Sequence, residues 1–158
     1  MTADTPTRAD HRRARSAARL AAVQALFQME QSDQDVDAVR AEFETHRFGQ
    51  TLDGETLEEA EPALFRATLD TAVDHQREID RLADRALSAA WPIDRIDPTL
   101  RALFRAAGAE LILGQTPPRV VVNEYVDVAH AFFPEGREAA FVNGVLDSMA
   151  HAARPEAF

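Results

Sequence analysis

Cysteine and lysine are both absent from the 158 residues. Without cysteine the chain can form neither disulfides nor thiolate metal sites. No apolar run approaches the roughly 18 residues that a membrane span needs, and the N-terminus lacks the basic-then-apolar pattern of a secretory signal. Without lysine, all 17 basic side chains are arginine. These absences predict a cytoplasmic protein with no membrane segment.

The sequence patterns of common catalytic sites are missing as well. There is no H-E-x-x-H zinc motif, no glycine-rich phosphate loop and no G-x-S-x-G nucleophile turn. Asp127 and His130 share one helical face, as in half of a di-iron site, but such a site needs a second pair and two further carboxylates. We therefore expect no catalysis, no cofactor and no bound transition metal, with a helical di-metal enzyme as an alternative.

Charge is distributed unevenly along the chain. The formal net charge of -10 at pH 7 by itself argues against nucleic acid, because an acidic surface repels phosphate. Residues 1–29, however, carry five arginines against two aspartates, a net of +3. Residues 30–80 carry fifteen acids against four arginines, a net of -11. The N-terminal end is thus a basic segment of an acidic protein.

Apolar residues recur at helical spacing between prolines and glycines, which predicts an all-α chain. The length suits one domain spanning residues 1–158. Residues 1–9 are expected to form a disordered leader and residues 45–61 an acidic loop. Helices are expected over residues 10–30, 36–43, 62–90, 97–114, 120–133 and 138–153.

Four arginines lie on one face of the first predicted helix. At 100° per residue, Arg8, Arg12, Arg15 and Arg19 fall within about 60° of one another. The same face continues into apolar residues that should enter the core, where four guanidinium groups cannot follow. Either the first turns project beyond the bundle or they stay unfolded until an anion binds. Arginine suits phosphate because its planar fork donates paired hydrogen bonds; the alternative is a solvated leader.

Other residues have both a packing and a binding interpretation. Phe27 lies at the spacing of core residues, where an aromatic side chain more often packs in the core than stacks on a base. Phe141 is also expected in the core. Asn143 and Gly144 interrupt the apolar run of the last helix. We expect Asn143 to cap a backbone group inside the bundle, because a buried amide needs partners. Gly144 should permit close helix packing.

These features together resemble the NusB family of bacterial transcription antitermination factors. The resemblance covers nearly the whole chain and implies two small helical bundles packed together, six to seven helices in all, with no catalysis and no cofactor. It rests on Arg12-Arg13-Ala14-Arg15 and Ala18-Arg19 before Ala22-Val23-Gln24-Ala25-Leu26, Trp91 with Asp94-Arg95-Ile96, Arg101 and Arg105 before Glu110-Leu111, Val122-Asn123-Glu124 with Ala129, and Phe141 to Asp147.

The resemblance also implies partners. It implies binding to the boxA sequence of nascent ribosomal RNA jointly with the ribosomal protein NusE, in an elongation complex with other Nus factors, and leaves open whether the free protein dimerises. Phe27 stands where relatives commonly carry Tyr, and Leu100 where they often carry an acid. The RNA-binding residues it implies are Arg12, Arg13, Arg15, Arg19, Gln24, Phe27, Arg137 and Asn143.

An alternative with the same fold is the NusB-like N-terminal part of some ribosomal RNA cytosine methyltransferases. The sequence contains no cofactor-binding glycine motif. We therefore expect the stand-alone factor.

Overall fold

A computed structural model describes residues 5, 7–47, 51–52, 55–56, 60–88 and 90–158. The described part contains seven α-helices, which confirms the predicted all-helical fold. They are α1 (Arg8–Gln31), α2 (Val36–Glu42), α3 (Pro62–Asp74), α4 (Gln76–Ala86), α5 (Pro98–Leu113), α6 (Pro118–Phe132) and α7 (Arg137–Ala153). The shorter elements are a π-helix (Phe43–Arg47), a 3-10 helix (Pro155–Ala157) and an antiparallel hairpin of β1 (Thr51–Leu52) and β2 (Glu55–Thr56).

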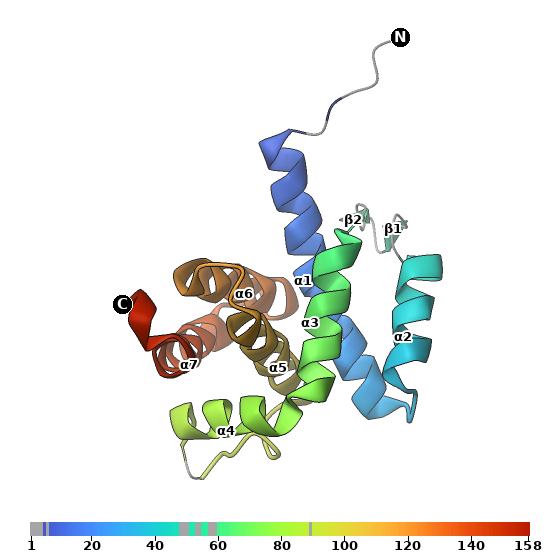
Figure 1. The fold of residues 1–158 in the computed structure, drawn as a ribbon. Coiled ribbons are helices and arrows are strands. Elements are labelled where there is room, and N and C mark those ends of the chain that lie inside the picture. Colours follow the sequence, from blue (N-terminus) through green and yellow to red (C-terminus); the bar gives the residue numbers. More distant parts are fainter. Residues whose placement is uncertain (1–4, 6, 48–50, 53–54, 57–59, 89) are drawn as a thin grey trace.

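Helix α5 lies at the centre of the molecule (Figure 1). Helices α1 and α3 pack on one side of it and α4, α6 and α7 on the other, so two small bundles meet along α5. Asp97 caps its first turn, and Gly114, at a left-handed φ of 69°, ends it. A Cβ added to Gly108 would lie 2.5 Å from Cγ2 of Ile79. Glycine is therefore needed where α4 crosses α5.

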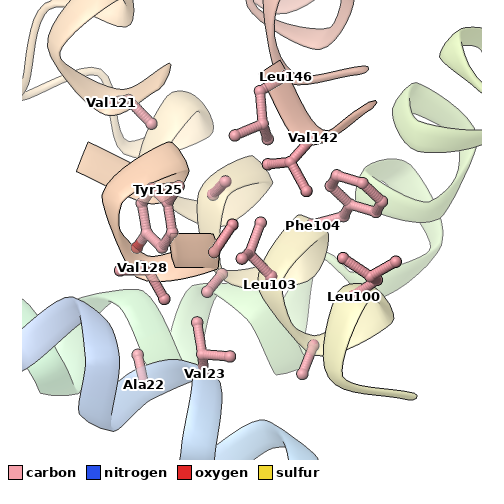
Figure 2. Close-up of a cluster of buried hydrophobic side chains, with 14 of the residues drawn as sticks. Ala22, Val23, Leu100, Leu103, Phe104, Val121, Tyr125, Val128, Val142 and Leu146 are labelled. Carbon is pink, nitrogen blue, oxygen red and sulfur yellow. The ribbon is translucent and has the colours of Figure 1, made fainter. Parts of the chain in front are cut away.

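The apolar core forms where the stripes of several helices meet. Figure 2 shows Leu103 and Phe104 of α5 among Val23 of α1, Tyr125 of α6 and Val142 of α7. All five are buried. The valine run at the start of α6 is helical, as predicted, because the same face of that helix continues into this core.

One predicted helix is wrong. The segment predicted as one helix over residues 62–90 instead contains α3 and α4, which are separated at His75, whose φ of -115° and ψ of 23° leave the helical region. Helix α4 ends at Ala86, four residues before the predicted end. The five residues from Asp74 to Glu78 are all polar, so no apolar stripe holds one straight helix there. The break instead lets α4 turn and pack on α5 and α7.

The predicted leader is shorter than expected. Helix α1 begins at Arg8, so Arg8 and Ala9 are helical. The hydroxyl of Thr7 accepts from the amide of Asp10 at 3.1 Å, and the Asp10 carboxylate accepts from the amide of Thr7 at 2.9 Å. This capping box fixes the first turn, and the bond from the Thr7 amide is the main reason that the pKa of Asp10 falls to about 2. Residues 1–4 and 6 lie outside the described residues.

The predicted acidic loop over residues 45–61 is also partly structured. Its first residues belong to the π-helix, and the hairpin of β1 and β2 lies inside it. At its end Ala60 is buried, and the amide of Glu61 donates to the carbonyl of Ala14 at 3.0 Å. Residues 48–50, 53–54 and 57–59 lie outside the described residues.

A buried ion pair joins the two central helices. Arg19 of α1 and Glu110 of α5 are each only 2% exposed. Nε of Arg19 donates to both Glu110 oxygens at 3.1 and 3.0 Å, and Nη2 donates to Oε1 at 2.7 Å. Burial is the largest single influence and lowers the pKa of Arg19. The hydrogen bonds to Glu110, together with the charges of Glu110 and its neighbours, outweigh burial, so the net pKa lies above the usual value. Thr116 also donates to Glu110 at 3.1 Å.

Removal of one partner should destabilise the fold. Arg19→Met leaves the Glu110 carboxylate buried without its cation, and we expect the free energy of unfolding to fall by about 3 to 5 kcal/mol. Arg15→Met, one turn earlier on the exposed face, is the matched control and should change it by less than about 0.5 kcal/mol. Urea denaturation measures both. Equal stability of the two variants would contradict the role of the buried pair.

Candidate functional site

The first turns of α1 extend beyond the helical bundle (Figure 1). Arg8, Arg12 and Arg15 are exposed there and form no ion pair or hydrogen bond with any described side chain. Arg13 is also exposed and pairs with Asp10 at 2.5 Å. The bundle holds this helix at Ala14, whose carbonyl accepts from the amide of Glu61 at 3.0 Å, and at Ser16, whose hydroxyl donates to Glu124 of α6 at 3.1 Å. The projecting arginines are therefore open to an external anion.

Arg19 does not belong to this exposed group. The expectation that it projects with the others is wrong, because Glu110 supplies a buried carboxylate and the Glu124 carboxylate lies 3.5 Å from its Nη1. Spacing along α1 could not reveal this, since both partners come from other helices. The exposed stripe therefore ends at Arg15.

Gln24 and Phe27 come together at a hollow of about 390 Å³ on the side of α1. Thr99 of α5 and Phe132 of α6 line its other walls. We call this the Phe27 hollow. The Phe27 side chain is 37% exposed, so its expected burial in the core is wrong. Oε1 of Gln24 is buried and has no hydrogen-bond partner among the described residues. The site thus combines an aromatic face with an amide, on the helix that carries the exposed arginines.

A second hollow, of about 330 Å³, lies beside the first turn of α5. Its lining includes two aromatic side chains, Trp91 and Phe141, two aliphatic ones, Leu100 and Ile96, and two charged ones, Arg95 and Asp97. We call this the Trp91 hollow. Trp91 is 63% exposed and Phe141 is 43% exposed. Such a cluster of exposed aromatic side chains is typical of an interaction surface. In the sequence, Trp91 and Phe141 gave a signal only as parts of the motifs that carry the family resemblance.

Phe141 is therefore not the core residue that was predicted. Its ring packs edge-on against Phe104, with 6.1 Å between ring centroids, while its other side remains open. Helix α7 directs Val142 and Val145 into the core instead. The buried face of α7 is displaced by one residue at this point, and only the packing of α7 on its neighbours determines that displacement.

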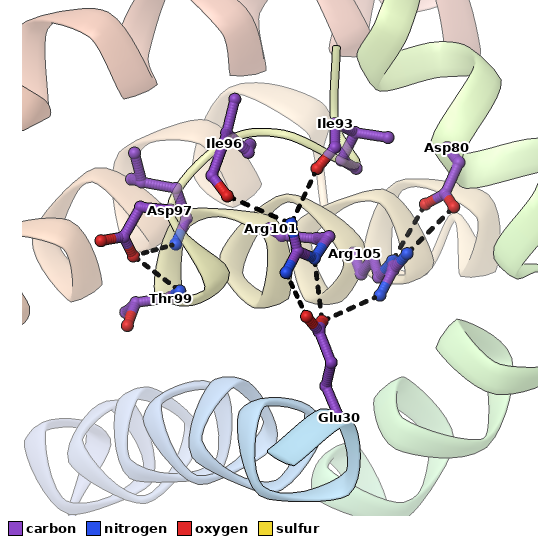
Figure 3. Close-up of polar contacts among 9 residues, drawn as sticks. Glu30, Asp80, Ile93, Ile96, Asp97, Thr99, Arg101 and Arg105 are labelled. Atoms are coloured by element: carbon purple, nitrogen blue, oxygen red, sulfur yellow. Dashed lines mark hydrogen bonds and ion pairs between the residues drawn. The ribbon is translucent and has the colours of Figure 1, made fainter. Parts of the chain in front are cut away.

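Polar contacts hold the segment that carries Trp91 (Figure 3). Arg101 of α5 donates to the carbonyls of Ile93 and Ile96, both at 3.1 Å. The same guanidinium donates to Glu30 at the end of α1, at 2.8 Å from its Nε. This hydrogen bond is the main reason that the pKa of Glu30 lies below its usual value. Arg101 thus fixes the loop between α4 and α5 against α1.

The remaining predicted residues lie on the surface of α7. Arg137 and Asn143 are exposed and have no partner among the described residues. A Cβ added to Gly144 would meet nothing within 4 Å. The expectations that Asn143 caps a group inside the bundle and that Gly144 permits close helix packing are therefore wrong. Both residues face outward because the adjacent valines occupy the buried side.

Two further properties bear on the kind of site. In the described part of the chain, no three histidine, aspartate or glutamate side chains gather where they could hold a metal ion. Asp127 and His130, the candidate half of a di-metal site, lie on the outer face of α6. None of the helices described is both long and apolar enough to cross a membrane.

Exposed arginines on a projecting helix and two aromatic hollows on a helical scaffold are the features of a protein that binds macromolecules. The chain belongs to the NusB family, which it matches over residues 16–151. The resemblance predicted from sequence motifs is thereby confirmed.

Several transcription antitermination proteins NusB are similar to this chain over most of their length. The protein from Granulibacter bethesdensis is 46% identical, with 92% of this chain and 93% of the relative covered. The protein from Nitrobacter hamburgensis is 49% identical, with 91% and 90% covered.

Solved structures agree. A crystal structure of antitermination factors NusB and NusE in complex with dsRNA matches with a TM-score of 0.70 and 27% identity, covering 89% of this chain and 98% of that one. The T. maritima NusB structure matches with a TM-score of 0.72 and 28% identity, covering 91% and 96%.

The exposure of Phe141 predicts a mild effect on stability. Phe141→Ala removes one edge-to-face contact, worth about 0.5 to 1.5 kcal/mol, and little buried area. Phe104→Ala empties a fully buried site and should cost about 3 to 5 kcal/mol. Thermal and urea unfolding of both variants measure the difference. If Phe141→Ala destabilised the fold as much as Phe104→Ala, Phe141 would be a core residue after all.

Proposed function

We propose that this chain is a transcription antitermination factor that binds RNA jointly with the ribosomal protein NusE and has no enzymatic activity. The observation that carries the proposal is the set of exposed, unpaired arginines on the projecting turns of α1. The antitermination proteins to which the chain is similar support it, as does the similarity to a complex of NusB, NusE and dsRNA. It acts in the cytoplasm, within an elongation complex that contains other Nus factors.

RNA binds first through its phosphates. Arg8, Arg12 and Arg15 offer guanidinium groups without a described partner at the point where α1 leaves an otherwise acidic protein. Arg13, which pairs with Asp10, lies among them. Counterion release from the RNA supplies most of the affinity in such contacts, and these contacts position the strand without reading its sequence. The buried Arg19 anchors the helix and takes no direct part.

Base contacts then provide preference for a boxA-type sequence. A base stacks on the exposed face of Phe27, which needs no hydroxyl for this, and the amide of Gln24 lies in the same hollow. Arg137 and Asn143 extend the polar surface along α7, where they flank Phe141 in the sequence.

NusE covers the Trp91 hollow. An exposed tryptophan beside an exposed phenylalanine, with charged groups at the rim, has the composition of a protein interface with a central anchor. The hollow contains one arginine and one aspartate, so it lacks the excess of positive charge that RNA requires. Protein and RNA therefore occupy separate surfaces.

The arginine contacts are tested by the salt dependence of RNA binding. Arg12→Gln with Arg15→Gln should weaken binding of boxA RNA and lower the log-log salt slope by about 1.4, at about 0.7 per phosphate of a single strand. The melting temperature should stay almost unchanged, because exposed arginines contribute little to stability. An unchanged slope would mean that these arginines contact solvent and not RNA phosphates, and the main support for RNA binding would be lost.

The protein interface is tested separately. Trp91→Ala should weaken NusE binding by about 2 kcal/mol or more, as for a central aromatic anchor, while RNA binding by the chain alone stays unchanged. Arg119→Ala is a control outside the hollow, because Arg119 lies in the first turn of α6, where its guanidinium packs over the ring of the C-terminal Phe158. Isothermal titration calorimetry with NusE gives both values. Full NusE affinity in Trp91→Ala would place the interface elsewhere.

A further inference from the structure

Helix α4 carries a second row of unpaired arginines. Arg77, Arg81 and Arg85 recur every four residues, so they follow one face of the helix. All three are exposed and form no ion pair or hydrogen bond with a described residue. Elsewhere in the described part, arginines that do form ion pairs with carboxylates are Arg13, Arg19, Arg40, Arg66, Arg101, Arg105 and Arg154. Other described arginines also lack a carboxylate partner, but only the first turns of α1 and helix α4 carry three of them along one helix.

The acids of α4 are engaged elsewhere. Asp80 accepts from Arg105 of α5 at 3.0 and 3.1 Å, and Asp84 accepts from the backbone amide of Ile93 at 2.7 Å. Glu78 lies 3.4 Å from the ring of His75. The helix therefore directs its aspartates toward neighbouring segments, while its arginines face outward and have no partner in the part of the chain that the structure describes.

These arginines line a continuous groove. One hollow of about 430 Å³ contains Arg81, Arg85 and Arg154, with Leu82 and Ile112 as its apolar wall. An adjoining hollow of about 490 Å³ contains Arg77. Arg81 and Glu78 line both hollows. The two hollows thus carry Arg77, Arg81 and Arg85 against two acids, Asp74 and Glu78, while Arg154, which lines the first hollow, is paired with Glu156 at 2.5 Å.

The shape and charge of the groove fit an extended polyanion. Three guanidinium groups spaced by about 6 Å along the helix axis, four residues at 1.5 Å each, suit successive phosphates better than a single small anion. A positively charged groove that follows the backbone is a feature of proteins that bind single strands; Leu82 and Ile112 add an aliphatic wall beside the arginines. The groove is remote from the first turns of α1, which lie at the opposite end of the molecule (Figure 1).

We propose that the α4 groove is a second RNA-binding surface, which holds the phosphate backbone of single-stranded RNA flanking the segment bound at α1. This inference rests on the proposed function and extends it. RNA that spans only the boxA sequence contacts α1 and the Phe27 hollow. Longer RNA continues across the protein and places its phosphates on Arg77, Arg81 and Arg85.

The test compares three RNAs: one spans boxA alone, and the other two are extended by flanking sequence at one end or at the other. Arg81→Gln with Arg85→Gln should leave the affinity for the short RNA unchanged. For the RNA extended at one of its ends, the affinity should fall by about tenfold and the salt slope by about 1.4, at about 0.7 per lost phosphate contact. In the unmodified protein, 4-thiouridine in that extension should crosslink to the segment 77–85.

The matched control is Arg40→Gln with Arg66→Gln, which changes the net charge equally but removes paired arginines of α2 and α3. In this control variant, the ratio of the affinity for extended RNA to the affinity for short RNA should equal the ratio in the unmodified protein. Equal losses in the two double variants would overturn the second surface. So would an unchanged affinity of the α4 variant for every extended RNA, together with no crosslinks to the segment 77–85. If the unmodified protein bound neither RNA, the proposed function would fail and this inference with it.

Discussion

The buried ion pair between Arg19 and Glu110 is the interaction on which the rest of the surface depends. It ties the middle of α1 to the central helix α5 and divides α1 into an anchored part and a projecting part. Because a buried guanidinium must keep its carboxylate, α1 cannot slide or rotate without a large cost. The exposed positions of Arg12 and Arg15, and the place of Phe27 at the edge of its hollow, follow from this one anchor.

Helix α5 connects the proposed surfaces. Its first turn lies between the Phe27 hollow, where Thr99 forms a wall, and the Trp91 hollow, where Leu100 does. Arg101, one residue further, holds the loop that carries Trp91. RNA and protein partners would thus bind on either side of one rigid element. A net acidic protein can bind RNA in this way because its unpaired arginines are concentrated in a few places.

Signals in the sequence predicted the structure correctly where the conformation depends only on residues nearby in the chain. Asp97 before Pro98 predicted the start of α5, and Gly114 its end, because caps act through neighbouring backbone groups. The break at His75 was missed, since no proline or glycine marks it. There the polar run only permits a bend, and the packing of α4 on α5 and α7 selects it.

By itself, the sequence determined the helical fold, the family and the basic character of the first helix, because these depend on spacing, motifs and charge along the chain. Tertiary structure alone decided which side chains are exposed. Arg19 became buried because Glu110 lies 91 residues away in sequence and directly opposite in the fold. Phe141 stayed half open because its neighbour Val142 took the core position. Burial depends on partners from other helices, and spacing within one helix contains no information about them.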